Sequence, residues 1–146
     1  MKPIKVFLMA LSMFVLVLLL SPQTARTQSQ QKPEELAQKS AEAWLALTDS
    51  GKYGESWEQA ASFFKDKVSR DQWIGSMTAY RSPMGKVLSR TLKGASYRTS
   101  LPNAPAGEYV VIQYNTSFQN QKDAIETVTP MLDKDGKWRV SGYYMK

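Results

Sequence analysis

The spacing of hydrophobic positions changes along the chain. Residues 6–20 are apolar apart from Ser12 and carry no charge. From residue 33 to about residue 80, apolar side chains recur at helical spacing, and from Lys86 onward they alternate with polar ones. These two periods predict a helical half followed by a strand-rich half in the region after the first apolar run.

The first apolar run is shorter than the ~20 residues that a helix needs to cross a bilayer. Lys2 and Lys5 precede it and a small polar stretch follows it. This order is typical of a secretory signal peptide. We therefore expect export to the periplasm or the extracellular space, with cleavage after Ala25 or, alternatively, after Thr27 or Ser29. An uncleaved N-terminal membrane anchor is the other interpretation.

This prediction divides the chain into three parts. The signal peptide covers residues 1–25, and residues 26–32 are polar, without an apolar anchor, which predicts a flexible linker. A single α+β domain is expected over residues 33–146. Once the signal peptide is removed, we expect no contact with the membrane.

Three helices are predicted in the first half of the domain. One covers residues 33–48, because Pro33 suits the first turn of a helix. A second is expected over residues 53–67. The third begins at Ser69, which starts a capping-box pattern, and stops before Pro83, since the residue before a proline avoids helical backbone angles.

Four strands are predicted in the second half: Val87–Arg98, Tyr109–Phe118, Ala124–Leu132 and Trp138–Met145. Pro130 indicates a sheet edge or a bulge in the third strand. In the last strand, simple alternation places Trp138, Val140 and Tyr144 on one face. The expected fold class is α+β, with three N-terminal helices packed on a curved four-stranded antiparallel sheet. Such an arrangement forms a cone with an apolar interior.

Composition excludes several kinds of chemistry. The chain has no histidine and no cysteine, so disulfides, thiolate nucleophiles, Ser-His-Asp triads and zinc sites built from Cys or His are ruled out. Asp133 and Asp135 lie in a predicted turn, but the downstream glutamate of a calcium loop is missing. We therefore expect neither a metal site nor a cofactor.

Charge is unevenly distributed in this basic chain, whose formal net charge is +6. Residues 72–107 contain no acidic side chain but five basic ones, namely Arg81, Lys86, Arg90, Lys93 and Arg98. They predict either a site for an anionic ligand or an edge strand protected against aggregation by positive charge. The pattern favours the protected edge. Arg90 shares its strand face with apolar residues, so it needs a partner, and Glu126 or Glu108 could supply one.

Aromatic residues are numerous, and Trp57 is one of them. They could line a pocket for an apolar or sugar-like ligand, but aromatic stripes at helical spacing more often fill a core. Interleaved basic and aromatic residues also raise the possibility of single-stranded nucleic acid binding. An exported protein seldom meets that partner, so we expect no nucleic acid.

Several segments resemble the domain of unknown function 4019 family, a set of secreted bacterial proteins. They are Gly51-Lys52-Tyr53 with Ser56-Trp57, Arg81-Ser82-Pro83-Met84-Gly85, Leu101-Pro102-Asn103-Ala104-Pro105, Gly107-Glu108-Tyr109-Val110-Val111, Glu126-Thr127-Val128, and Gly136-Lys137-Trp138-Arg139-Val140 with Gly142-Tyr143-Tyr144. The resemblance covers about residues 35–146 and implies no catalytic residues, because the family has no established activity. Its order of elements is similar to the cystatin-like or nuclear transport factor 2-like cone, a fold that decides no function.

These observations lead to one leading hypothesis and two alternatives. The leading one is an exported, non-catalytic module that binds a small or anionic ligand, or a partner, at the cell envelope. Its candidate ligand-binding residues are Arg81, Arg90, Tyr114, Glu126 and Trp57. The first alternative is a small isomerase-like enzyme that uses Glu126 and Tyr114 for acid–base chemistry. The second is a structural domain that forms a homodimer through the open sheet face, burying Tyr143 or Trp138.

Overall fold

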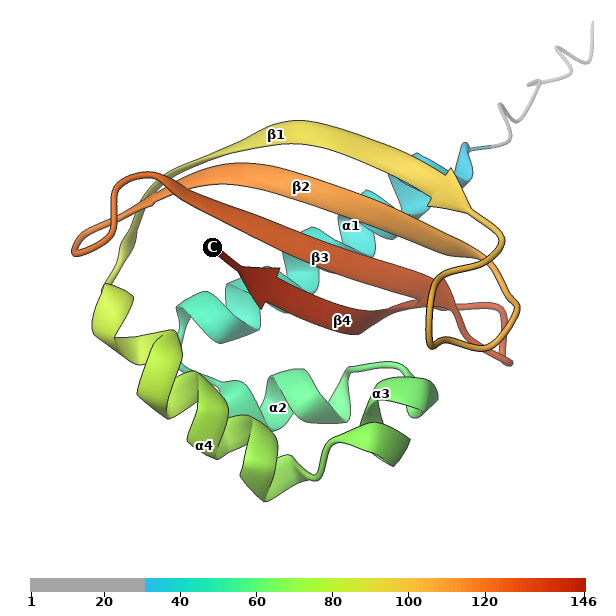
Figure 1. The fold of residues 1–146 in the computed structure, drawn as a ribbon, viewed down its shortest axis with the longest axis horizontal. Coiled ribbons are helices and arrows are strands. Elements are labelled where there is room, and N and C mark those ends of the chain that lie inside the picture. Colours follow the sequence, from blue (N-terminus) through green and yellow to red (C-terminus); the bar gives the residue numbers. More distant parts are fainter. Residues whose placement is uncertain (1–30) are drawn as a thin grey trace, which may run out of the picture.

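The computed structural model describes residues 31–146, which form an α+β fold with a four-stranded antiparallel sheet (Figure 1). The helices of this part are α1 (Pro33–Asp49), α2 (Tyr53–Glu58), α3 (Ser62–Lys67) and α4 (Arg70–Tyr80), and the 3₁₀ helix η1 (Ser82–Met84) follows. The strands are β1 (Val87–Arg98), β2 (Tyr109–Phe118), β3 (Ala124–Leu132) and β4 (Trp138–Met145), in the spatial order β1-β2-β3-β4. The predicted signal peptide and residues 26–30 of the predicted linker lie outside the described residues.

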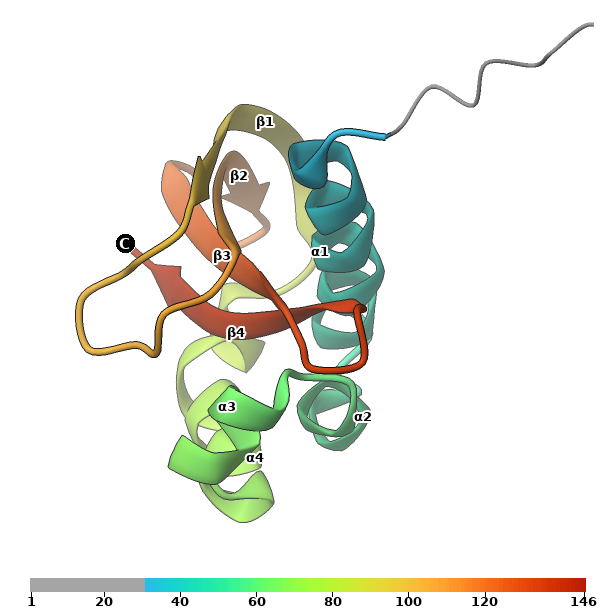
Figure 2. The ribbon, with the colours of Figure 1, turned by 90° about the vertical axis from the view of Figure 1, so that its right-hand side faces the viewer.

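Helix α1 forms the main contact between the helical half and the sheet. Its buried stripe includes Ala37, Ala41, Trp44 and Leu45, and the helix contacts all four strands. Figure 2 shows α1 along one side of the sheet, with α2, α3 and α4 gathered below β4. The alternate side chains of β2 that begin at Val110 complete this core. The apolar faces that the helical and strand periods predict therefore pack against each other in one core.

The helix predicted over residues 53–67 is wrong as a single element, because the chain forms two short helices there. Residues 59–61 separate α2 from α3, and two of them, Ala60 and Ala61, are fully buried. The backbone of Ala61 is extended, and its N–H donates to the carbonyl oxygen of Val140 on β4 at 2.8 Å. The N–H of Ala61 therefore bonds to β4 instead of to a carbonyl oxygen within a continuous helix. The small alanine side chains allow the backbone between α2 and α3 to lie close to β4. Residues 31–146 therefore contain four α-helices where the sequence predicted three.

The start of α4 confirms the predicted capping box. The backbone N–H of Gln72 donates to the Ser69 hydroxyl at 3.2 Å, and the Ser69 N–H donates to the Gln72 side chain at 3.0 Å. These two bonds satisfy backbone donors that a helix start leaves free. The helix ends at Tyr80, shortly before Pro83, as predicted.

All four strands have the predicted bounds, but the predicted face of Tyr144 is wrong. Thr129 lies opposite Gly142 while the next residue, Pro130, lies opposite Val140, so Ser141 is an extra residue in β4. This bulge reverses the alternation beyond it. Tyr143 consequently packs against the core, whereas Tyr144 is 62% exposed. The expected bulge near Pro130 is confirmed, and β3 is an inner strand of the sheet.

Candidate functional site

The most strongly hydrogen-bonded side chain in the interior is Glu126 of β3, which is fully buried. Arg90 of β1 donates from Nε to Oε2 at 2.7 Å and from Nη2 to Oε1 at 3.2 Å. The Thr116 hydroxyl donates to Oε2 at 2.5 Å, and the Tyr143 hydroxyl donates to Oε1 at 2.6 Å. Both carboxylate oxygens thus accept hydrogen bonds, and the donors come from β1, β2 and β4.

A second carboxylate, Asp49 at the last residue of α1, extends this network. Arg90 donates from Nη1 to Oδ2 at 2.7 Å and from Nη2 to Oδ1 at 3.0 Å. Arg81 donates to Oδ1 of Asp49 at 3.1 Å and to the carbonyl oxygen of Gly85 at 2.9 Å. We call Asp49, Arg81, Arg90 and Glu126 the ion cluster. The two guanidinium groups offset the negative charge that the end of a helix disfavours.

Burial and charge shift the pKa values of three groups in and beside the ion cluster. Burial alone would lower the pKa of Arg90, but the hydrogen bonds and negative charges of Asp49 and Glu126 raise it above its ordinary value. Burial, together with the charge of Glu126, raises the pKa of Tyr143 well above that of a free tyrosine. Burial also raises the pKa of Tyr114 to about 12, with a further contribution from Glu42.

The structure brings together four of the five residues predicted to bind a ligand. Arg81, Arg90 and Glu126 belong to the ion cluster, and Tyr114 lies opposite Glu126 in the register of β2 and β3. Trp57 lies apart on α2, where its indole N–H donates to the carbonyl oxygen of Val68 at 2.7 Å. The role of these residues in ligand binding stays a prediction.

The predicted ion pair of Arg90 is confirmed with Glu126 as the partner. Glu108, the other candidate, instead accepts a hydrogen bond from the Tyr97 hydroxyl at 2.8 Å. Sequence reasoning did not find Asp49 as the second partner. The available signal was the position of Asp49 at the end of the first helix. A negative charge is unfavourable at a helix C-terminus, so a carboxylate there needs a nearby cation.

The five basic residues of the acid-free segment do not form one patch. Arg81 is buried and Arg90 is enclosed by two carboxylates. The other three, Lys86, Lys93 and Arg98, are exposed along the edge strand β1 or directly before it. This arrangement matches the protected-edge interpretation of the charge pattern.

The carboxylate–tyrosine pair expected for acid–base chemistry differs from the observed one. Tyr143, not Tyr114, donates to Glu126, because the bulge at Ser141 turns Tyr143 toward the interior. The Tyr114 hydroxyl is buried and has no hydrogen-bond partner among residues 31–146. With no exposed atom, Glu126 offers a substrate no direct approach.

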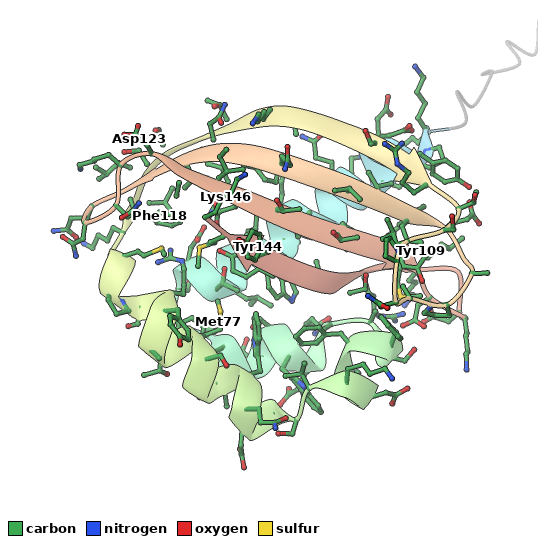
Figure 3. The ribbon with its side chains drawn as sticks, in the orientation of Figure 1. Met77, Tyr109, Phe118, Asp123, Tyr144 and Lys146 are labelled. Atoms are coloured by element: carbon green, nitrogen blue, oxygen red, sulfur yellow. The ribbon has the colours of Figure 1, made fainter. Side chains whose placement is uncertain are left out.

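A different region is open to solvent and concave. We call it the α4–β4 groove, because it lies between α4 and the end of β4, with a volume of about 370 Å³. One face of α4 provides Trp73, Met77 and Tyr80, and Figure 3 shows Met77 between the helix and the sheet. The opposite wall and one end include Met84, Tyr143 and Met145. No charged side chain lines the groove among the described residues.

A second groove, of about 580 Å³, lies between α1, α2 and the start of β4. Three of its four charged side chains, Glu55, Glu58 and Arg139, have ion-pair partners within the protein. Arg139 makes two hydrogen bonds of 2.7 Å to Asp135, and Glu58 pairs with Arg70 at 3.2 Å. Of the two grooves, the α4–β4 groove is therefore the one whose lining is apolar and not committed to ion pairs.

The chain belongs to the protein family of unknown function DUF4019, whose family model matches residues 40–143. The comparisons with curated proteins and with solved structures returned no match. Within residues 31–146, no helix has the length and apolar character needed to cross a membrane. The same residues contain no group of three or more acidic side chains placed to hold a metal ion.

Proposed function

We propose that the protein is an exported, non-catalytic binding module that acts at the cell envelope and holds an apolar ligand or partner segment in the α4–β4 groove. The observation that carries this proposal is the open groove itself, lined by methionine and aromatic side chains. Its volume lies within the range typical of ligand pockets. Methionine side chains adapt to irregular apolar ligands.

The ion cluster supports a structural rather than a catalytic centre. Both oxygens of the Glu126 carboxylate already accept hydrogen bonds, from Arg90, Thr116 and Tyr143. Chemistry at this position would require breaking several charge-assisted hydrogen bonds first. In our proposal, Arg81, Arg90 and Glu126 therefore position the walls of the groove, and Tyr143 connects the two regions.

Export and the cone-like shape are further parts of the proposal. Export rests on the charged start and the apolar run of residues 6–20. For the cone, register shifts in β1 and opposite Pro130 are the irregularities that allow a sheet to bend. A homodimer is an alternative occupant of the groove, and its formation would be visible in the same experiments.

The test is a titration of the full chain with the neutral, apolar fluorophore N-phenyl-1-naphthylamine. Tyr80 lines the groove and is 73% exposed, so Tyr80→Lys introduces a charge at little cost to folding. We expect affinity for the fluorophore to fall about tenfold or more in this variant. Leu88→Lys is the matched control, because Leu88 is an exposed apolar residue on the distant strand β1.

Two outcomes would contradict the proposal. One is no binding of the fluorophore by the unmodified protein, and the other is equal loss of binding in both variants. Native mass spectrometry of protein purified from its own host measures the mass of any molecule that stays bound. The denaturing mass of the same sample tests whether residues 1–25 have been removed.

A further inference from the structure

The end of β4 presents unpaired backbone groups to the α4–β4 groove. Ile125 and Lys146 exchange both backbone hydrogen bonds, at 2.8 and 3.2 Å. In an antiparallel ladder, such pairs alternate with pairs whose N–H and C=O groups point away from the neighbouring strand. Met145 and Tyr143, one and three residues before Lys146, occupy these alternate positions. Their backbone groups therefore point to the free edge of β4.

The two halves of this edge differ. In the first half, the carbonyl oxygen of Val140 accepts from the N–H of Ala61, so the junction of α2 and α3 covers the strand. In the second half, Tyr143 and Met145 make no backbone hydrogen bond to a segment outside the sheet within residues 31–146. Figure 1 shows the end of β4 facing α4 across this region.

Side chains at the open half are arranged to receive a strand. Tyr143, Tyr144 and Met145 all line the groove, and Tyr144 is 62% exposed. Tyr143 and Met145 lie opposite the buried residues Val128 and Glu126, so their side chains are on the inner face of the sheet. Residues that pair directly across two strands place their side chains on the same face of the sheet. A segment paired with Tyr143 and Met145 would therefore direct every second side chain toward the apolar face of α4.

Basic residues lie next to the groove along the chain. Lys146 follows Met145, and Lys86 lies two residues after Met84, another residue of the groove. Both lysines are exposed, and neither takes part in an ion pair within the described part of the chain. Residues 72–107, which include most of α4 and all of η1, contain no acidic side chain. Lys86 and this acid-free segment are complementary to a carboxylate.

We propose that the α4–β4 groove binds an extended peptide that adds antiparallel to β4 as a fifth strand, with apolar residues at alternate positions and an acidic residue near Lys86. This inference rests on the proposed function and names the class of partner. Main-chain hydrogen bonds to Tyr143 and Met145 provide affinity, and the pocket for alternate side chains provides selectivity.

The first test uses a capped peptide, acetyl-Ser-Val-Thr-Val-Thr-Val-Glu-amide, and two N-methylated versions of it. In an antiparallel fifth strand, the valines that enter the groove also point their N–H groups at β4. N-methylation of the valines should therefore weaken binding at least about tenfold. N-methylation of the threonines, whose N–H groups point away, should change the affinity less than about twofold. Equal affinity for all three peptides would overturn strand addition.

The second test changes the protein. Met145→Pro removes one free N–H without touching the β3–β4 ladder, because proline is tolerated where the N–H points away from a neighbouring strand. Met145→Ala is the matched control, since it shortens the side chain but keeps the N–H. We expect the proline variant to bind the peptide at least about fivefold more weakly than the alanine variant. The two variants should bind the neutral fluorophore alike.

The fluorophore and peptide experiments together distinguish a failure of strand addition from a failure of the proposed function. If the fluorophore binds in a Tyr80-dependent way but N-methylation has no effect, strand addition is wrong and the apolar groove remains. If the fluorophore binds without regard to Tyr80, the proposed function fails as well. The free protein could also self-associate and thereby protect the amides of Tyr143 and Met145 from hydrogen exchange. That result would assign the free edge of β4 to a second copy of the chain and would overturn the proposed peptide binding.

Discussion

The ion cluster and the α4–β4 groove are connected by Tyr143, which donates to Glu126 and lines the groove, but they differ in how their polar groups are satisfied. In the ion cluster, both oxygens of Glu126 have donors within the protein. At the groove, the side-chain lining is apolar, and the backbone of Tyr143 faces an open strand edge. The difference teaches that the most polar site in a fold need not be its binding site. A satisfied network stabilises, whereas unused hydrogen-bonding capacity beside apolar surface is available to a partner.

The largest expected effect comes from removing the centre of the ion cluster. Arg90→Ala leaves Glu126 buried without its cation, and we expect a loss of about 3 kcal/mol or more in the free energy of unfolding. Urea denaturation measures this loss. Lys93→Ala, an exposed change on the same strand, should stay within about 0.5 kcal/mol. Unchanged stability in Arg90→Ala would mean that the cluster does not hold the fold together.

A smaller effect is expected where the two regions meet. Tyr143→Phe removes the hydroxyl that donates to Glu126 at 2.6 Å but keeps the ring that lines the groove. We expect a loss of about 1–2 kcal/mol in stability and an unchanged affinity for the neutral fluorophore. Tyr144→Phe is the control on the exposed face. A loss of fluorophore binding in Tyr143→Phe without a loss of stability would reverse the roles of the two regions.

Alkaline pH should weaken the ion-cluster region. The pKa of Tyr143 is raised, chiefly by burial and then by the charge of Glu126. Its contribution to stability is therefore complete below the ordinary tyrosine pKa of about 10 and is lost as the pH rises above that value. Comparing urea denaturation at about pH 8 and about pH 11, we expect a smaller loss for Tyr143→Phe than for the unmodified protein, by up to about 1.4 kcal/mol. Equal losses would show that this hydroxyl is not coupled to folding.

The smallest effect on stability is expected at the groove itself. Tyr80 is largely exposed, so Tyr80→Lys should change the free energy of unfolding by no more than about 0.5 kcal/mol. The same variant is the one expected to lose binding. A large loss of stability would instead assign the groove side chains to the core.

Local patterns in the sequence determined much of this protein. Period-two alternation gave the bounds of all four strands, the Ser69–Gln72 capping box gave the start of α4, and Pro130 indicated a bulge. The predicted pairing of Arg90 with Glu126 is confirmed, although Leu88 and Leu92, the apolar residues from which it was inferred, are exposed. Each of these signals acts over a few residues or follows from the cost of burying a charge.

Only the tertiary structure decided the remaining features. The break between α2 and α3 depends on a hydrogen bond from Ala61 to a strand about 80 residues away along the chain. The extra residue Ser141 turns Tyr143 inward, and simple alternation cannot show where such a bulge lies. The groove exists because α4 and the free end of β4 lie side by side. Contacts between distant segments set these features, and a periodic pattern carries no information about which segments meet.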